Sequence, residues 1–366
     1  MSPRACPCTP LLPALALTLV AAVGCREPAD SAFRYSTDAS SRAGLAVVAD
    51  GVITGNEGGT VVRLDRDGRV VWRVSLGREV AARPVVVGDG VIVGTVAGDV
   101  VRLGMEDGAE RWRVTGEPPV LTPGVTDEAR TSVYFVAPDG AVRAHAVDTG
   151  KVRWRAPAPK ATEPAPDSPR GLPAPVLAEG LLVVARGSAG LVALSTDDGR
   201  QAWARDVRDV VGLEAWRDAV YVSARPGRLL ALRAKDGGSL WEQSVADGLT
   251  GPPAMALGTL WMGAGAAASP ALLGVDRESG KEVARVTLPD PLLTRVTPIR
   301  GELLLVPTAG RDGRLLVLKP PSWERAFALR TDTPLRTAPV VLGDEFFVLG
   351  LDGRVMAWRL KPPPEP

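Results

Sequence analysis

Residues 82–112 read ARPVVVGDGVIVGTVAGDVVRLGMEDGAERW, and this stretch contains the unit that decides the fold. It holds three short apolar runs, separated by turns with Gly and Asp, and a final segment that ends in Trp112. A Gly-Asp pair between two apolar runs is typical of a β-hairpin. The unit therefore predicts four short antiparallel strands, with Pro84 before the first and Trp112 in the fourth.

The third apolar run of this unit recurs eight times along the chain, at an average spacing of about 42 residues. The copies are residues 61–64, 100–103, 142–145, 191–194, 229–232, 272–275, 315–318 and 355–358. Four strands per unit of about 40 residues is the spacing of a propeller blade. The sequence predicts an all-β fold: an eight-bladed β-propeller of four-stranded antiparallel blades over residues 43–360.

A helical solenoid with a similar period is excluded by the local pattern. The runs are short, rich in β-branched residues and bounded by Gly, Asp and Pro, whereas helices need apolar residues three and four apart over longer segments. Proline cannot donate to a sheet ladder and belongs at a strand edge, as on the innermost strand of a blade. It occurs at this phase in six units, as Pro84, Pro123, Pro175, Pro253, Pro298 and Pro339.

A tryptophan follows most of the third runs, and we expect it to fill the wedge between neighbouring blades. The regular set is Trp72, Trp112, Trp154, Trp203 and Trp241. Trp323 follows less regularly, and Ala284 takes the position in the sixth unit. Trp216 and Trp261 fall outside the phase, which leaves them as surface or channel contacts or as core residues.

The last unit lacks a fourth strand before the Pro-rich tail at residues 361–366. Residues 33–36, Phe-Arg-Tyr-Ser, precede the first complete unit and are available to supply it. We therefore expect this N-terminal strand to close the last blade, because ring closure removes an exposed sheet edge.

The N-terminus is typical of a targeting segment. Arg4 and an apolar run at residues 11–23 precede small residues and Cys25, a pattern similar to a bacterial lipoprotein signal. The prediction is a signal peptide at residues 1–24 and lipid attachment at Cys25; a plain signal peptide cut nearby is the alternative. Residues 25–42 then provide the lipidated Cys, a polar tether and the closing strand.

Composition excludes several classes of site. The 43 basic and 42 acidic residues give a net charge of +1 without a basic stripe, so a nucleic-acid partner is not expected. Once the signal is removed, Cys25 is the one remaining Cys and His145 the one His. No Cys/His metal cluster and no internal disulfide can form. We interpret His145 as a core or channel-facing residue, and we expect no catalytic, cofactor-binding or metal-binding residue. A calcium ion at one of the Asp-containing turns stays an open alternative.

Residues 144–154, AHAVDTGKVRW, resemble the tryptophan-docking repeat of quinoprotein (PQQ-type) propellers, in which Ala, Thr, Gly, Lys and Trp recur in this phase. The resemblance covers residues 43–360 and implies the propeller fold. One branch of these proteins comprises dehydrogenases that use a quinone, calcium and usually vicinal cysteines. This chain has no Cys in the propeller and no insertion long enough to roof a cofactor.

The other branch, the BamB-like propeller lipoproteins of the outer-membrane β-barrel assembly machinery, is similar in length, lipid anchor and blade number. In that family an Arg-Gly segment in the connection into blade four, followed by Ala-Pro, helps to dock the barrel subunit. The matching residues here are Arg170, Gly171, Ala174 and Pro175. The family's apolar residues before the Arg are replaced by Asp167 and Pro169. The Pro-rich insert at residues 157–166 reads either as a docking arm or as a solvated loop.

These observations predict a non-catalytic envelope lipoprotein that acts as a protein–protein interaction scaffold, with outer-membrane β-barrel assembly as its specific form. The resemblance implies a monomer at the outer membrane, facing the periplasm, with an envelope protein as partner and no cofactor. The membrane would be contacted through the lipid alone. The alternatives are a quinoprotein-type oxidoreductase and a propeller that binds a small ligand or polysaccharide.

Overall fold

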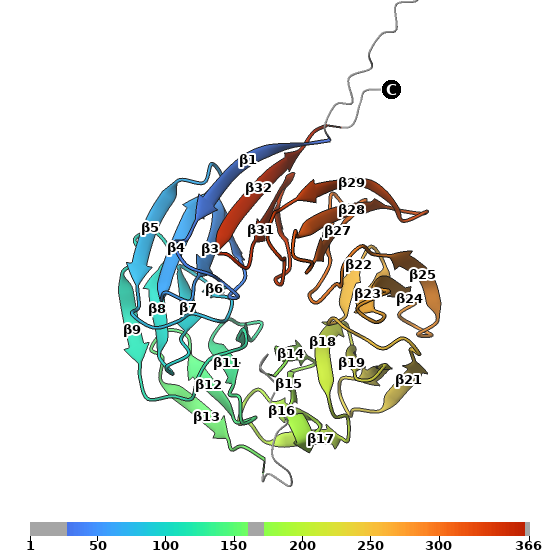
Figure 1. Cartoon of the computed structure of the whole chain (residues 1–366). Helices are drawn as coiled ribbons and strands as arrows, with labels where there is room; N and C mark the ends of the chain where they lie inside the picture. The colour runs from blue at the N-terminus through green and yellow to red at the C-terminus, as the bar shows by residue number, and fades with distance from the viewer. Residues whose placement is uncertain (1–27, 160–171, 363–366) are drawn as a thin grey trace, which may run out of the picture.

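The structure, a computed structural model, describes residues 28–159 and 172–362. These residues form thirty-two strands in eight four-stranded antiparallel sheets, arranged as the blades of a closed ring (Figure 1). One turn of 3-10 helix, η1 (Gly187–Ala189), is the one helical element in the described part. No helix there is long and apolar enough to cross a membrane. The predicted eight-bladed β-propeller is confirmed.

Each of the first four blades uses four consecutive strands, ordered from the channel outward. Blade one has β2 (Ala46–Val48), β3 (Gly51–Gly55), β4 (Thr60–Asp65) and β5 (Val70–Ser75); blade two has β6 (Val85–Val87), β7 (Gly90–Gly94), β8 (Val100–Gly104) and β9 (Glu110–Val114); blade three has β10 (Val125–Thr126), β11 (Ser132–Val136), β12 (Val142–Ala146) and β13 (Val152–Ala156); blade four has β14 (Val176–Ala178), β15 (Leu181–Ala185), β16 (Leu191–Ser195) and β17 (Gln201–Arg205).

Blades five to seven continue this order, and blade eight takes its outer strand from the N-terminus. Blade five has β18 (Val210–Trp216), β19 (Ala219–Ala224), β20 (Arg228–Arg233) and β21 (Ser239–Ser244); blade six has β22 (Ala254–Ala256), β23 (Thr259–Ala264), β24 (Ala271–Val275) and β25 (Glu282–Thr287); blade seven has β26 (Thr297–Ile299), β27 (Leu303–Thr308), β28 (Arg314–Lys319) and β29 (Glu324–Arg330); blade eight has β30 (Val340–Leu342), β31 (Glu345–Leu349), β32 (Arg354–Leu360) and β1 (Ala29–Ser36).

The two faces of the ring are made by different turns. We call the side with the turns between first and second strands and between third and fourth strands the hairpin face. The opposite side, with the turns between second and third strands and the links between blades, is the connection face. Each innermost strand starts at the connection face, and the six predicted prolines lie at or near these starts. Proline's missing N–H therefore falls on the channel edge of each sheet.

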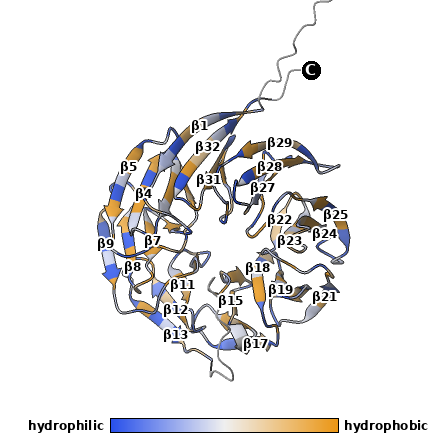
Figure 2. Ribbon diagram, viewed as in Figure 1, coloured by the Kyte–Doolittle hydropathy of each residue, from blue (hydrophilic) through white to orange (hydrophobic). Residues whose placement is uncertain are grey.

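The hydrophobic core consists of layers between neighbouring blades. Each of the eight clusters of buried apolar residues draws its members from two adjacent sheets. Second strands such as β7 are buried along their whole length, whereas the fourth strands β5 and β9 expose most of their residues. Figure 2 shows hydrophilic and hydrophobic residues alternating along these outer strands. The blades are therefore stabilised by packing face to face.

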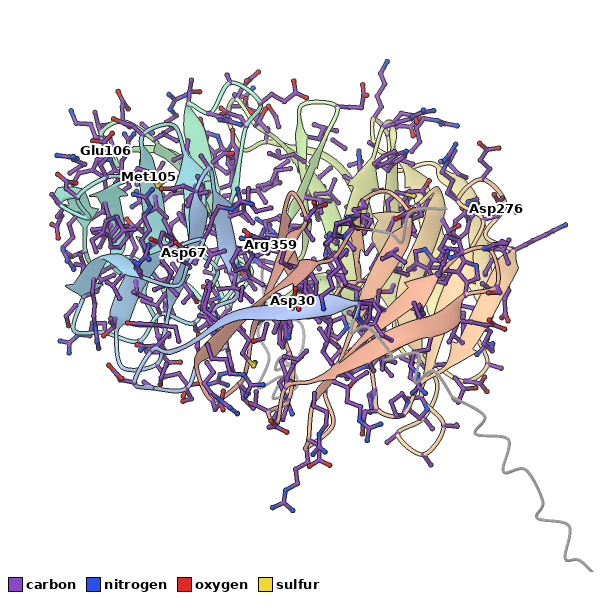
Figure 3. The ribbon with its side chains drawn as sticks, turned by 90° about the horizontal axis from the view of Figure 1, so that it is seen from above. Asp30, Asp67, Met105, Glu106, Asp276 and Arg359 are labelled. Atoms are coloured by element: carbon purple, nitrogen blue, oxygen red, sulfur yellow. The ribbon has the colours of Figure 1, made fainter. Side chains whose placement is uncertain are left out.

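Strand β1 closes the ring, as predicted, by pairing antiparallel with β32. It begins at Ala29, earlier than the expected strand at residues 33–36. Seen edge-on, it lies along the outside of the ring (Figure 3). Asp30 lies opposite Arg359 in the β-ladder. The Lys361 N–H donates to the Pro28 carbonyl at 3.0 Å, so the two ends of the described chain meet at the hairpin face.

The five regular tryptophans lie at the same level of their fourth strands and contact the next blade. Each indole N–H donates to a backbone carbonyl of that blade, at 2.7 to 3.0 Å: Trp72 to Met105, Trp112 to Val147, Trp154 to Thr196, Trp203 to Ala234 and Trp241 to Arg277. Each ring also covers a turn glycine of that blade so closely that a Cβ there would lie 2.5 to 2.8 Å from ring carbons. Glycine is required at these turns by both the positive φ and the contact.

The contact between blades six and seven differs from this regular arrangement. Ala284 stands at the tryptophan position of blade six, opposite Gly274. In blade seven, Trp323 stands at the turn position that glycine holds elsewhere, with a φ of 58°. Its backbone N–H donates to the Lys319 carbonyl. Its ring packs edge-on against Trp261 at 4.5 Å, in the same cluster as Ala284. The indole that replaces the missing fourth-strand tryptophan therefore comes from the following blade, and it packs on Trp261 of blade six.

Candidate functional site on the connection face

The sequence-predicted partner residues Arg170 and Gly171, and the lipidation candidate Cys25, lie outside the described residues. The two ends of the insert that carries Arg170 are described, and they meet on the connection face. A Cβ on Gly140 would lie 3.2 Å from Pro159 and 3.4 Å from the Cβ of Arg186. A Cβ on Gly187 would likewise lie 3.9 Å from the side chain of Leu172. The insert therefore leaves and rejoins the ring beside η1.

Arg186 is a half-buried cation at the base of this insert. Burial lowers the pKa of its guanidinium from the ordinary value, and the nearby Asp139 carboxylate partly opposes that shift. Within the described residues, the buried Nε and Nη2 atoms of Arg186 have no hydrogen-bond partner. Buried charged groups are normally paired, so this guanidinium marks the base of the insert as a polar contact point.

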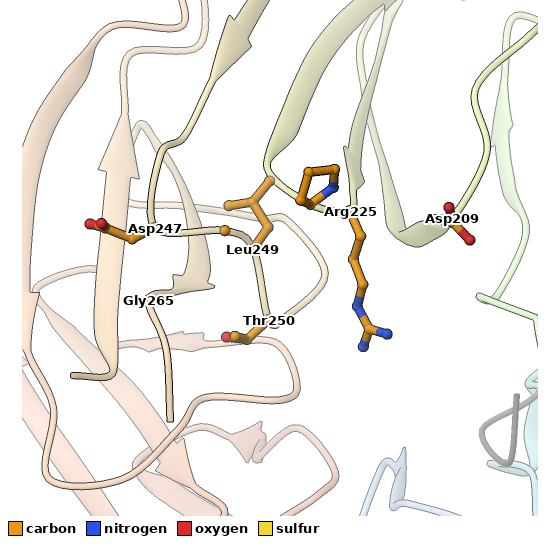
Figure 4. Close-up of a pocket in the computed structure, with 8 residues that line it drawn as sticks. Asp209, Arg225, Asp247, Leu249, Thr250 and Gly265 are labelled. Atoms are coloured by element: carbon orange, nitrogen blue, oxygen red, sulfur yellow. The ribbon is translucent and has the colours of Figure 1, made fainter. Parts of the chain in front are cut away.

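A hollow of about 500 Å³ opens on the same face between blades five and six. Its walls come from the link into blade five, the inner turn of that blade, the link into blade six and the inner turn of blade six. Asp209 and Asp247 lie on opposite sides of Arg225 (Figure 4). Asp247 is paired with Arg285 at 3.3 Å, whereas Arg225 and Asp209 are exposed and form no ion pair within the described parts of the chain.

The chemistry of this hollow suits recognition of a polar chain segment. Among the described residues, Arg225 and Asp209 give it a guanidinium and a carboxylate that are not engaged in ion pairs, above the buried Leu249. Across residues 28–159 and 172–362, no three His, Cys, Asp or Glu side chains converge closely enough to hold a metal ion.

Of the remaining aromatic and histidine candidates, Trp261 and His145 lie in the core and Trp216 lies on the surface. Trp261 and His145 are completely buried, and the ring of His145 packs edge-on against Phe135. Trp216, at the end of β18, is 42% exposed on the hairpin face. Sequence reasoning missed Asp209, Arg225 and Asp247, because they come from separate turns that no local motif links.

Comparison with known proteins places this ring in a family. A family model described as outer membrane protein assembly factor BamB matches residues 57–265, more than half of the chain. BamB of Yersinia pestis is 26% identical over 209 residues, which are 55% of this chain and 53% of that protein. The chain thus spans about half the length of this curated relative.

Two further similarities describe the wider fold. Quinohemoprotein alcohol dehydrogenase ADH IIB of Pseudomonas putida is 31% identical over 120 residues, which are 28% of this chain and 17% of that enzyme. The crystal structure of BamB from Moraxella catarrhalis has a TM-score of 0.74 at 17% identity, and the match covers 91% of this chain and all of the solved one. The structural match supports the fold alone, while the family model covers most of blades one to five and the start of blade six. The chain belongs to the family of outer membrane protein assembly factor BamB.

Proposed function

We propose that this protein is a non-catalytic, lipid-anchored scaffold of the bacterial envelope that takes part in the assembly of outer-membrane β-barrel proteins. The observation that carries the proposal is the match to the BamB family model over residues 57–265. The fold gives the proposal a physical basis, because a rigid ring presents loops from several blades on one face.

The connection face is the surface we assign to the partner. It carries the base of the insert, the half-buried Arg186 and the hollow beside Arg225. Arg170 and Gly171 of the insert are proposed as further contacts on the strength of the sequence resemblance. We propose the lipid anchor at Cys25 and, from the family resemblance, a monomer at the outer membrane that faces the periplasm.

A pull-down from detergent-solubilised envelopes tests this function. The full-length chain, with a C-terminal tag, is expected to recover a subunit of the barrel-assembly machinery. Arg170→Ala should weaken recovery, while Arg34→Ala, at an exposed position of the outer strand β1, serves as the matched control. Recovery of no such subunit by folded bait would overturn the proposal.

The anchor is tested separately by fractionation. Cys25→Ser should move the protein from the membrane fraction to the soluble periplasmic fraction. If the variant stays in the membrane fraction after a salt wash, lipid attachment at Cys25 is wrong.

A quinoprotein-type oxidoreductase is the second candidate, because the partial match to a quinohemoprotein alcohol dehydrogenase reaches 31% identity. Adding pyrroloquinoline quinone and calcium to the purified protein, followed by an alcohol and a redox dye, tests it. Dye reduction would favour this candidate over the scaffold.

A further inference from the structure

Eight equivalent residues ring the connection-face mouth of the channel. In blade two, the ladder runs from Val85 through Ile92 and Arg102 to Trp112, so these residues form one row across the sheet. Arg83 lies two positions before the innermost member of the row. In every blade we take the residue two positions before the innermost member of the corresponding row. These residues are Gly44, Arg83, Pro123, Ala174, Gly212, Pro252, Arg295 and Ala338.

This ring of positions is uncharged except at two blades. Six members are Gly, Pro or Ala, which can neither bind an ion nor fill the mouth, and the other two are Arg83 and Arg295. Gly44 lies directly beside Arg83, since a Cβ built on it would be 3.7 Å from the Cβ of Arg83. The repeat alone does not require a charge here, so the two arginines are a property of this chain.

Arg295 is fixed and neutralised by blade five. Its guanidinium donates to the carboxylate of Glu214 and to the carbonyl of Leu213. Glu214 in turn accepts the Met255 N–H at 3.2 Å, so it is anchored from blade six as well. Arg295 is therefore a rigid cation whose charge is largely compensated.

Arg83 has no such compensation. Its side chain is exposed, and it forms no ion pair with the carboxylates of the described residues. Partial removal from water by the surrounding ring lowers the pKa of Arg83 from its ordinary value. The guanidinium of Arg295 lowers it further. No carboxylate is among the causes of this shift, so the described residues leave the charge of Arg83 uncompensated.

We propose that Arg83 binds a carboxylate side chain on an acidic loop of the partner protein, with Arg295 as a fixed second cation at the mouth. The inference rests on the proposed scaffold function and names the partner's chemistry. Guanidinium and carboxylate groups match in plane and spacing, and such pairs are the strongest side-chain hydrogen bonds available. The loop would enter on the face that carries the insert and the hollow beside Arg225.

The test uses a capped peptide, Gly-Asp-Glu-Asp-Glu-Gly, and its neutral counterpart with Asn and Gln in place of the acids. Titration calorimetry at low salt should show binding of the acidic peptide alone. Arg83→Gln should weaken that binding about tenfold. Glu214→Gln should strengthen it, because the variant frees the charge of Arg295. Arg34→Gln, at an exposed position of the outer strand β1 that forms no ion pair in the described chain, should leave binding unchanged.

Thermal stability gives an independent readout. Arg83 forms no ion pair in the described chain, so Arg83→Gln removes no stabilising contact and its melting temperature should be at least that of the wild type. Unchanged peptide affinity in Arg83→Gln, equal binding of the neutral peptide, or weaker binding in Glu214→Gln would each overturn the proposal. If the pull-down recovers its subunit with wild-type and Arg83→Gln bait alike, this inference fails while the scaffold function stands.

Discussion

Each fourth-strand tryptophan joins two blades by a ring contact and a hydrogen bond at once. Trp203 is 8% exposed, covers Gly237 of blade five and donates its Nε1–H to the Ala234 carbonyl at 2.7 Å. The ring supplies buried apolar area, while the N–H fixes the position of the neighbouring turn. The two contributions can be separated by substitution.

Trp203→Ala is expected to destabilise the fold by about 3–5 kcal/mol, because it leaves a cavity between blades four and five. Trp203→Phe keeps much of the ring and loses the hydrogen bond, so it should cost clearly less. Urea unfolding followed by circular dichroism measures both. Trp216→Ala, at an exposed site, is the control and should change stability by less than about 0.5 kcal/mol. Equal effects of all three would contradict the docking role.

The buried surroundings of His145 favour the neutral form of its imidazole ring. Its Nδ1 lies 2.8 Å from the Gly150 carbonyl and therefore carries the proton, while Nε2 is buried without a partner in the described chain. Burial is the main cause that lowers the pKa of His145, and the charges of Arg143 and Arg155 lower it further. The hydrogen bond to the Gly150 carbonyl and the charge of Glu117 oppose the shift. A proton on Nε2 would place an unpaired charge inside blade three.

The folded state therefore binds this proton less readily than the unfolded chain, whose histidine titrates near the ordinary value of about 6.5. Stability should be complete above that pH and fall below it, by up to about 1.4 kcal/mol per pH unit. Urea midpoints at pH 7.5, 6.5 and 5.5 measure the decline. The sequence contains one His, so His145→Gln should flatten the profile in this window. A profile that His145→Gln leaves unchanged would contradict the assignment.

At the scale of elements, blades six and seven show how one repeat unit compensates for its neighbour. The indole missing at Ala284 is replaced by Trp323, which occupies a glycine position at φ 58°. A non-glycine residue in this region is strained, so its packing must offset a backbone cost.

A double-mutant cycle tests the exchange. Ala284→Trp alone should destabilise blade six by about 1–3 kcal/mol, because two indoles compete for one space. Trp323→Gly alone should also destabilise it, because the space is left empty. The double variant restores the regular arrangement and should be more stable than the sum of the two losses predicts. Additive losses, measured by urea unfolding, would show that the two positions do not share a space.

The sequence was sufficient to predict the elements, because each is specified locally. Valine-rich runs, Gly-Asp turns and the prolines at or near the starts of six first strands recur in phase, and the third runs all form third strands. The role of Trp323 was not predictable, because its partner Ala284 belongs to another unit and neither residue fits the repeat pattern. The contact exists through packing between sheets, which no local pattern encodes.

For the whole molecule, closure of the ring depends on β1. Phe33 pairs with Ala357 and lies on the turn glycine Gly68 of blade one, the place that a tryptophan takes in other blades. Deleting residues 29–36 should expose the edge of β32 and lower the melting temperature by many degrees. Phe33→Ala should lower it less, and Arg34→Ala, whose side chain is exposed, should have little effect. An unchanged melt after the deletion would show that the ring is closed by other contacts.

The candidate site is a property of the assembled ring, which explains why it was only partly predictable. The insert and its Arg170 stand out in the sequence as a break in the repeat. Arg225, Asp209 and Asp247 meet only because links from successive blades converge on one face. The isolated charge of Arg83 becomes visible once the blades are aligned by ladder register and compared position by position.

The meeting of Lys361 with Pro28 at the hairpin face has a practical consequence. A biosensor chip that captures a biotin at the C-terminus would hold every molecule by that rim. The opposite surface, with Arg225 and Arg83, would then face the flowing analyte in a uniform orientation, and the same geometry makes Pro28 and Lys361 suitable points for joining in a circular permutant.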